Sequence, residues 1–357
     1  MNGDRHWQQS HTWNEILSQS DIWQTVLDEL SHSKQLERIV SSSNGQSERI
    51  FIGCGTSFYL AEAAALSWAL LTGCVAKAFP ASEVLLYPML IRGNNSNAQA
   101  VVISRSGRTS EAVRAANMLR QDLDTRVLGI TCANGSELEH ACDEAIVLHA
   151  ADEKSMVMTR SFTSMLLSLQ FLAALHANNA KFIDSLRAMA KEFRTRIPSI
   201  AEEMKEFVGN HRFTDYVFLA QGPFYGIARE AALKVMEMSC SYSQFFHTLE
   251  FRHGPKAIVS PSTCLTFLLS DSGFKAEVEV MEEMKELGGV NIAICNKAGD
   301  GRRQTCDLLI EMNWNGDELA LLAPYTVPCQ LLGFFTGIGK GLNPDVPKNL
   351  SRVVILD

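Results

Sequence analysis

The first stretch whose residues could do chemistry is ISRSGRTSEA, from Ile103 to Ala112, which follows the apolar residues 100–102. It is rich in small and hydroxyl-bearing residues, namely Ser104, Ser106, Gly107, Thr109 and Ser110. The pattern predicts a strand that ends in a turn and opens a helix. Hydroxyl and backbone N–H groups at a helix N-terminus suit an anion, and a phosphate offers them three acceptor oxygens.

A second turn of the same kind, CGTS at 54–57, places Thr56 and Ser57 after the preceding predicted strand. Arg105 and Arg108 could add positive charge to the first turn. The alternative is that all these hydroxyls only cap helices, as such residues commonly do. Two such turns in one half of the chain favour the anion site.

Three charged residues stand at helical spacing on the largely apolar helix predicted at 228–238: Glu230, Lys234 and Glu237. Their spacings of four and three residues place them on one helix face. Charges on a buried helix are costly unless they are paired or used. The pattern therefore indicates either a structural row of ion pairs or a group of proton-transfer residues.

The stretch HTLEFRHGPKAIV brings Glu250, Arg252 and His253 within four residues, and Gly254-Pro255 predicts a turn directly after them. Histidine gives and takes a proton near neutral pH, which suits a catalytic loop. A purely structural histidine is the alternative.

The elements that must position these residues occur twice. FIGCGTSFYLAEAAAL (51–66) aligns with FLAQGPFYGIAREAAL (218–233), and VVISRSGRTSEA (101–112) aligns with FLLSDSGFKAEV (267–278). VLGITCAN (127–134) likewise resembles VNIAICNK (290–297). Three matches in the same order at nearly constant offset indicate a duplicated domain. Because Pro223 lacks an N–H group and no hydroxyl follows it, we expect the first copy to hold the anion.

Each copy reads as strand, glycine turn, helix, strand, second turn, helix and strand, which is a right-handed βαβαβ unit. We therefore predict an α/β fold of two tandem duplicated domains, each a parallel sheet flanked by helices in a flavodoxin-like three-layer αβα arrangement. The predicted organisation is a helical N-terminal arm at 1–34, a phosphate-binding domain at 35–190, a second domain at 200–340 with the catalytic residues, and a tail at 341–357 closing over the site. Ligands of such sheets bind at the carboxyl ends of the strands.

The composition excludes several classes of protein. Of 357 residues, 46% are hydrophobic and 20% are charged, as in a globular protein, and the net charge of -8 argues against nucleic-acid binding. The nine cysteines form no CxxC pair, so we expect neither zinc nor a disulfide framework. The N-terminus has no apolar signal segment, and we predict a cytoplasmic protein with no membrane partner.

Taken together, GCGTS, SRSGRTSE, REAALKVME, EFRHGP and NPDVPKNLSRVV resemble the double-domain form of the sugar isomerase (SIS) family, in family order. The resemblance covers the chain from about residue 35 onward. It is nearest to the isomerase half of glutamine-dependent glucosamine-6-phosphate synthase and to the tagatose-6-phosphate ketose/aldose isomerase type, also described as galactosamine-6-phosphate deaminase.

The resemblance implies roles for particular residues. Those that match the family's phosphate positions are Ser57, Ser104, Arg105, Ser106 and Thr109. Glu237 matches the carboxylate that moves a proton between C1 and C2, and His253 matches the residue that opens the sugar ring, reaching the site from a second subunit. Lys234 and Glu250 match accompanying polar positions, and no metal or organic cofactor is implied.

The sequence departs from the synthase in two respects. It begins at MNGDRHW without room for a glutaminase domain, so synthase activity with glutamine is not expected. Arg352 also stands where the synthase has an imine-forming lysine, and a guanidinium stays protonated and forms no imine. Arg352 is then available to contact the phosphate or carboxyl end of a substrate.

We therefore expect an isomerase or deaminase that acts on a hexosamine or hexose 6-phosphate through an enediol or enolamine, as a homodimer. One alternative is a deglycase that splits a fructosamine 6-phosphate made from an amino acid. A non-enzymatic alternative is a sugar-phosphate sensor, which would need only the phosphate site.

Overall fold

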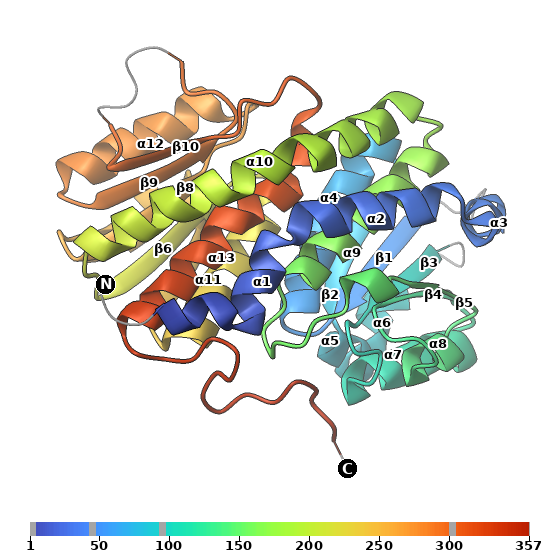
Figure 1. Ribbon diagram of the computed structural model, residues 1–357. Coiled ribbons are helices and arrows are strands. Elements are labelled where there is room, and N and C mark those ends of the chain that lie inside the picture. Colours follow the sequence, from blue (N-terminus) through green and yellow to red (C-terminus); the bar gives the residue numbers. More distant parts are fainter. Residues whose placement is uncertain (1–4, 43–47, 93–97, 300–304, 357) are drawn as a thin grey trace. The chain divides into compact units, whose positions relative to one another are not determined.

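The computed structural model describes residues 5–42, 48–92, 98–299 and 305–356, and the chain divides into two compact units (Figure 1). The first-copy unit comprises residues 21–154, 158–190 and 351–357. The second-copy unit comprises residues 1–20, 155–157 and 191–350. Each unit contains one copy of the sequence repeat together with segments from distant parts of the chain.

The first-copy unit is built on a parallel sheet with the strand order β2-β1-β3-β4-β5. Its strands are β1 (Glu48–Gly53), β2 (Val75–Pro80), β3 (Ala98–Ile103), β4 (Arg126–Thr131) and β5 (Glu144–Val147). Its helices are α2 (Gln19–Ser31), α3 (Lys34–Ser42), α4 (Thr56–Thr72), α5 (Ala81–Leu86), α6 (Pro88–Arg92), α7 (Ser110–Gln121), α8 (Glu137–Ala141) and α9 (Arg160–His176), with a 3-10 turn η2 (His149–Ala151). Helix α2 belongs to this unit from Asp21 onward.

Alternate residues of β1 serve the two faces of this sheet, as the pleat requires. Ile50 and Ile52 belong to the core that also contains residues of α5, α7 and α8. Phe51 points the other way, with its ring 5.9 Å from that of Trp68 on α4. Helices therefore cover both faces, and the sheet is the middle of three layers.

The second-copy unit has a parallel sheet with the order β10-β9-β8-β6-β7. Its strands are β6 (Asp215–Ala220), β7 (Tyr242–His247), β8 (Thr263–Leu268), β9 (Val290–Cys295) and β10 (Leu308–Glu311). Its helices are α1 (His11–Leu17), the larger part of α10 (Ala180–Asn210), α11 (Phe224–Ser239), α12 (Phe274–Glu286) and α13 (Leu322–Gly339). Its 3-10 turns are η1 (Arg5–Gln9), η3 (Glu250–Arg252), η4 (Pro255–Ile258) and η6 (Glu318–Leu321).

Counted along the chain within each unit, both sheets have the order 2-1-3-4-5, which is the flavodoxin-like order. The predicted tandem α/β fold is thereby confirmed. The three strands predicted in each copy are the central ones, which are mostly apolar and almost wholly buried. The prediction missed the edge strands β2, β5, β7 and β10, because these are short or partly exposed and lack that pattern.

Helix α13 packs against α11 (Figure 1). Two glycines of α13 let the backbones of the two helices approach closely. A Cβ atom at Gly333 would lie 2.8 Å from the Lys234 carbonyl oxygen, and one at Gly337 would lie 2.2 Å from the Met238 carbonyl oxygen. The segment Glu318–Gly339 is long and apolar enough to cross a membrane, but 94% of its apolar window is buried inside the protein. Its apolar character is accounted for by this packing.

Candidate active site

The turn after β3 gathers hydroxyl groups at the start of α7. Thr109 is the N-cap residue of α7, and the Ser104 hydroxyl donates a hydrogen bond to Thr109 Oγ1 over 3.3 Å. Ser106 Oγ accepts a hydrogen bond from the Arg108 N–H over 3.2 Å. No side-chain capping bond from Thr109 to the helix forms, so its hydroxyl is not used as a cap.

Thr56 and Ser57 begin α4 directly after β1, and both side chains are buried. Strands β1 and β3 are parallel neighbours, with Ile52 opposite Val102 near their carboxyl ends. Because parallel neighbours end at the same edge, the two hydroxyl-bearing turns belong to one edge of the first-copy sheet. The structure thus brings the predicted anion-binding turns to one edge, while binding itself stays a prediction.

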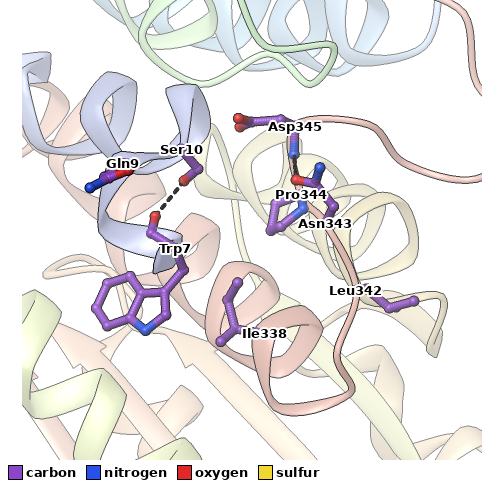
Figure 2. A pocket seen from close by; sticks show the side chains of 8 residues that line it. All are labelled: Trp7, Gln9, Ser10, Ile338, Leu342, Asn343, Pro344 and Asp345. Atoms are coloured by element: carbon purple, nitrogen blue, oxygen red, sulfur yellow. Dashed lines mark hydrogen bonds between the residues drawn. The ribbon is translucent and has the colours of Figure 1, made fainter. Parts of the chain in front are cut away.

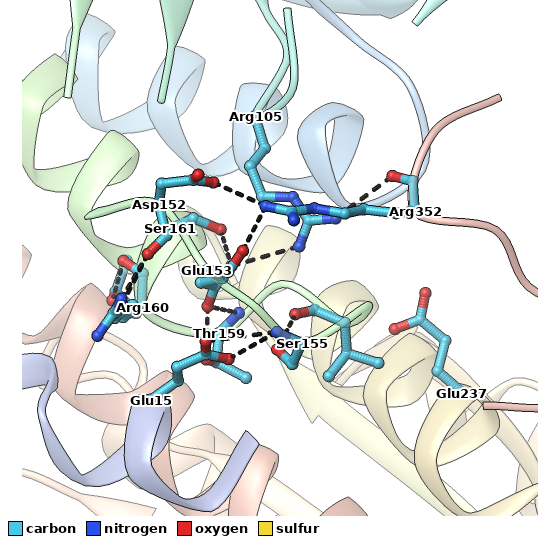
Figure 3. Close-up of polar contacts among 12 residues, drawn as sticks. Glu15, Arg105, Asp152, Glu153, Ser155, Thr159, Arg160, Ser161, Glu237 and Arg352 are labelled. Carbon is cyan, nitrogen blue, oxygen red and sulfur yellow. Dashed lines mark hydrogen bonds and ion pairs between the residues drawn. The ribbon is translucent and has the colours of Figure 1, made fainter. Parts of the chain in front are cut away.

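Arg105 turns inward from the same loop into a buried polar network (Figure 3). Its guanidinium Nη1 lies 3.4 Å from Glu153 Oε2, and both side chains are at most 5% exposed. Glu153 also accepts hydrogen bonds from the Thr159 N–H and hydroxyl, over 2.7 and 2.6 Å, and from the Ser161 hydroxyl. Arg105 therefore positions the turn against Glu153 and brings little uncompensated charge to it.

Glu153 was not predicted from the sequence. The signal for it was the run of hydroxyl-bearing residues in MTRSFTSM (158–165). In the structure, Thr159 and Ser161 from that run are two of the donors to Glu153.

The C-terminal tail of the first-copy unit lies along the beginning of α7. The Ser110 N–H donates to the Val354 carbonyl oxygen over 3.2 Å, and the Leu356 N–H donates to Ser110 Oγ over 2.9 Å. Arg352 pairs with Asp152, 3.0 Å away, and its carbonyl oxygen accepts from Arg105 Nη2 over 3.4 Å (Figure 3). Arg352 is thus held beside the Arg105 network.

In the second-copy unit, α11 presents the three predicted charged residues as one ion-paired row. Lys234 Nζ lies 3.3 Å from Glu230 Oε1 and also pairs closely with Glu237. The side chains of Lys234 and Glu230 are fully buried, whereas that of Glu237 is 17% exposed. The predicted shared face is confirmed, and Glu237 is the carboxylate of the row that a ligand could reach.

Two opposing effects act on the pKa of the Lys234 ammonium. Burial lowers it, but the carboxylates of Glu230 and Glu237 raise it by more, so the net direction is upward. Lys234 is therefore charged at neutral pH, and its ammonium pairs with both carboxylates of the row.

Glu250 begins the 3-10 turn η3, and His253 follows that turn, before Gly254 with φ of 126°. Both residues are exposed. The His253 N–H donates to the Glu250 carbonyl oxygen over 2.9 Å. Within the described residues, no hydrogen bond or ion pair joins the side chain of either residue to the charged row of α11. That His253 reaches the site from a second subunit, as the resemblance implies, stays a prediction.

A second histidine lies close by in the chain and was not singled out from the sequence. The His247 ring stacks on Tyr225 with centroids 3.7 Å apart, and its Nδ1 lies 3.1 Å from Gln221 Oε1. Burial lowers the pKa of His247, and a smaller opposing effect comes from the Glu250 carboxylate. The only signal in the sequence was its position in HTLEFRHGP.

A pocket of about 480 Å³ lies elsewhere in the second-copy unit, between the N-terminal residues and the end of α13 (Figure 2). Its lining residues are Trp7, Gln9, Ser10, Ile338, Leu342, Asn343, Pro344 and Asp345. The Asp345 carboxylate accepts hydrogen bonds from the N–H groups of His11 and Thr12, over 2.8 and 2.7 Å. Since its acid caps α1 and none of the predicted catalytic residues lines it, this pocket is not the candidate active site.

No group of three or more His, Cys, Asp or Glu side chains suited to a metal ion occurs in the part of the chain that the structure describes.

The SIS domain family matches this chain twice, over residues 45–175 and 211–332, which is more than half of its length. The chain belongs to the SIS domain family. The two matches contain the two sequence copies, so the duplication and the family are established together.

Among curated proteins, the chain is 29% identical over 269 residues to the isomerizing glutamine–fructose-6-phosphate aminotransferase of Pyrobaculum aerophilum, covering 72% of this chain and 44% of that protein. It is 26% identical over 357 residues to the enzyme of the same name from Caldanaerobacter subterraneus subsp. tengcongensis, covering 96% and 56%. The chain spans about half the length of these curated relatives.

Among solved structures, a glucosamine-6-phosphate deaminase from Thermotoga maritima matches with a TM-score of 0.80 and 28% identity, over 97% of this chain and 100% of that one. A tagatose-6-phosphate ketose/aldose isomerase from Escherichia coli matches with a TM-score of 0.85 over 96% of both chains, and at 22% identity it shows the shared fold. The expected class, an enzyme of sugar phosphates, agrees with these relatives.

Proposed function

We propose that this protein is an isomerase or deaminase of a hexosamine or hexose 6-phosphate, and that its amino-sugar activity yields a ketose 6-phosphate and ammonia. The observation that carries the proposal is the ion-paired row on α11, in which a buried ammonium holds one partly exposed carboxylate. The likeness to the deaminase from Thermotoga maritima over the whole of that chain supports the choice of reaction.

Substrate binding is assigned to the hydroxyl-bearing turns of the first copy. Ser104, Ser106 and Thr109, with Thr56 and Ser57, supply neutral donors at the starts of α7 and α4, where backbone N–H groups also favour a phosphate. Arg105 acts indirectly in this proposal, because its charge is balanced by Glu153.

Glu237 is assigned the proton transfer. In the open-chain amino sugar, the carboxylate takes the proton from C2, and the electrons of the C–H bond form a C1–C2 enolamine while the C1 oxygen gains a proton. Returning the proton to C1 leaves a C2 imine, and water converts this imine to the ketose and ammonia. One carboxylate can serve both carbons because the proton leaves and returns on neighbouring atoms.

Ring opening is assigned to His253, which we propose comes from the second subunit of a homodimer. The ring oxygen must gain a proton while the C1 hydroxyl loses one, and an imidazole can exchange both near pH 7. The exposed position of His253, without a partner for its side chain in the described residues, supports a role outside its own α11 row.

The test is to measure ammonia release and ketose formation from glucosamine 6-phosphate and galactosamine 6-phosphate, for the wild type and Glu237→Gln. Equal amounts of ammonia and ketose, lost in the variant, are expected. Ketose without ammonia from an aldose 6-phosphate would indicate a plain isomerase. No turnover of either amino sugar, with turnover of a fructosamine 6-phosphate, would replace the proposal by the deglycase.

A further inference from the structure

The second copy contains its own version of the phosphate turn, at residues 270–273 between β8 and α12. In the repeat, Ser104, Ser106, Gly107 and Glu111 correspond to Ser270, Ser272, Gly273 and Glu277. The same elements are therefore present a second time: a strand end, two hydroxyls, a glycine and a helix N-terminus.

Glu277 fills the inner half of this second turn. Its carboxylate accepts the Ser270 N–H and the Ser270 hydroxyl, each over 2.9 Å, and its side chain is completely buried. A Cβ atom at Gly273 would lie 2.4 Å from Glu277 Oε1. A larger residue at Gly273 would therefore displace the Glu277 carboxylate.

Glu318, from the 3-10 turn η6, fills the outer half. Its carboxylate accepts the Asp271 N–H and, over 3.5 Å, the Ser272 hydroxyl. Two oxyanions from distant parts of the chain thus meet the backbone and hydroxyl donors of one turn. A bound phosphate would present its oxygens to the same kinds of group.

The first copy differs at the decisive residue. Glu111 occupies the position of Glu277 on α7 but makes no hydrogen bond to Ser104 in the described structure, and Ser104 donates to Thr109 instead. The donors of the first turn are thus not occupied by a carboxylate of α7. The difference lies in the placement of the carboxylate and not in the residue type.

The hydrogen bonds of the turn favour the ionised carboxylate of Glu277, although burial outweighs them. Burial, opposed by the Ser270 hydrogen bonds and reinforced by Glu318, raises the pKa of Glu277 to about 7. Burial also raises the pKa of Glu318, near Asp271 and Asp317. The hydrogen bonds that the turn donates to Glu277 and Glu318 therefore stabilise two neighbouring carboxylates.

We infer that the second domain carries a phosphate cradle of the same design as the first, and that the chain closes it permanently with its own carboxylates, Glu277 and Glu318. The chain then has one site for a phosphate-bearing ligand, although its fold repeats the cradle. This inference shares with the proposed function the assignment of the first turn as the anion site, and the experiment separates the two.

The experiment counts bound inorganic phosphate per chain by equilibrium dialysis. The wild type is expected to bind one phosphate and the double variant Ser104→Ala/Thr109→Ala none. Glu277→Ala/Glu318→Ala, which opens the second cradle, is expected to bind two. Combining all four substitutions should leave one phosphate, which a further Ser270→Ala removes.

Glu277→Gln/Glu318→Gln is the matched control, because it removes both charges but keeps the bulk that fills the turn. It should bind one phosphate, as the wild type does. If Glu277→Ala/Glu318→Ala retains the wild-type circular dichroism and still binds only one, the inference is overturned.

Two further outcomes separate this inference from the proposed function. Phosphate retained by Ser104→Ala/Thr109→Ala and lost on adding Ser270→Ala would show that the second cradle is open in the natural chain, which also overturns the inference. If the wild type binds no phosphate while the opened variant gains one, the assignment of the first turn fails, but the closure of the second cradle by Glu277 and Glu318 stands.

Discussion

Glu230 and Glu237 both pair with the Lys234 ammonium, but their different exposure suits them to different roles. Glu230 is sealed in the packing of α11, while Glu237 keeps part of its side chain at the surface. A group that exchanges a proton with a substrate must reach it, whereas a buried partner only holds the ammonium in place.

We therefore predict a division between two isosteric variants. Glu237→Gln should lower kcat by roughly 10²-fold or more, since the proton acceptor is lost, and should lower stability less than Glu230→Gln does, because its side chain is partly exposed. Glu230→Gln should instead destabilise the fold by roughly 3 kcal/mol, because it leaves a buried ammonium with one partner fewer. Steady-state kinetics and thermal unfolding of both proteins would check this, and equal effects on kcat would contradict it.

The two histidines near β7 provide a second matched pair. His253→Asn should reduce kcat by roughly 10²-fold, since ring opening then lacks its acid and base. His247→Asn should change kcat only a few-fold, because His247 is already engaged with Gln221 and stacked on Tyr225. The measurement is kcat on the cyclic sugar phosphate. A larger loss of kcat in His247→Asn than in His253→Asn would assign ring opening to His247.

Glu277 predicts how stability depends on pH. Its pKa rises from 4.5 to about 7 on folding, so between these values the folded protein holds more protons than the unfolded chain. Stability from this group is therefore present at low pH and is lost as pH rises towards 7 and above. Since one pKa unit is about 1.4 kcal/mol, the effect is up to about 3 kcal/mol.

Glu277→Gln should flatten this dependence. Urea unfolding at pH 5.5 and pH 8 would show a smaller difference in the free energy of unfolding for the variant than for the wild type. Some slope should remain, because burial raises the pKa of Glu318 as well. An unchanged difference would contradict the prediction.

At the scale of elements, the turn of the first copy depends on a glycine that approaches a neighbouring loop. Gly107 has φ of 60°, and a Cβ atom there would lie 2.2 Å from Ser136 Oγ and 2.9 Å from Thr131 Oγ1. The turn between β3 and α7 is thus shaped by the loop after β4. The nearby Gly135 has a similar φ of 64° but nothing within 4 Å of its Cβ position.

Gly107→Ala should consequently weaken phosphate binding by at least tenfold, because Ser136 must move and the turn with it. Gly135→Ala, with the same backbone strain but no clash, should cost about 1 kcal/mol of stability and leave binding within about twofold. Phosphate affinity and thermal unfolding of both variants give the comparison. Normal binding by Gly107→Ala would show that the turn does not hold the phosphate.

The central strands and both hydroxyl-bearing turns were predictable because they depend on local patterns that the chain repeats. Their placement at one edge followed from parallel pairing. Glu153 and Glu318 were not predictable, because each meets its turn through contacts 48 and 47 residues away along the chain. Arg352 was recognised by its position in the tail, but its pairing with Asp152 depends on how the tail docks.

For the whole molecule, the proposed homodimer makes a quantitative prediction about mixed subunits. Glu237→Gln and His253→Asn each inactivate a different contribution to a site. If His253 serves the partner's site, a mixed dimer has one site with both losses and one intact site. Random mixing of equal amounts should then restore about a quarter of the wild-type activity, since half the dimers are mixed.

The check is to unfold and refold the two inactive variants together and separately, and to assay each sample at equal protein concentration. Wild type carried through the same procedure sets the scale. Activity in the mixture no greater than the sum of the separate samples would place His253 in the site of its own chain, or exclude the dimer.

The N-terminal segment belongs to the second-copy unit and depends on residues near the other end of the chain. Asp345 accepts from Thr12 N–H and hydroxyl, and Gln19 Nε2 donates to Gln330 Oε1 over 2.8 Å. Trp13 lies against Phe334 and Phe335 on α13, with ring centroids 5.5 and 5.7 Å apart.

This arrangement constrains how the protein is made. A ribosome adds roughly 5–20 residues per second, so the first residues emerge roughly tens of seconds before their partners do. During that time the tryptophan-bearing segment lacks its contacts with Asp345, Gln330 and the phenylalanines of α13, and Trp13 is without that cover. The second-copy unit can therefore complete its packing only after the C-terminal part of the chain has been synthesised.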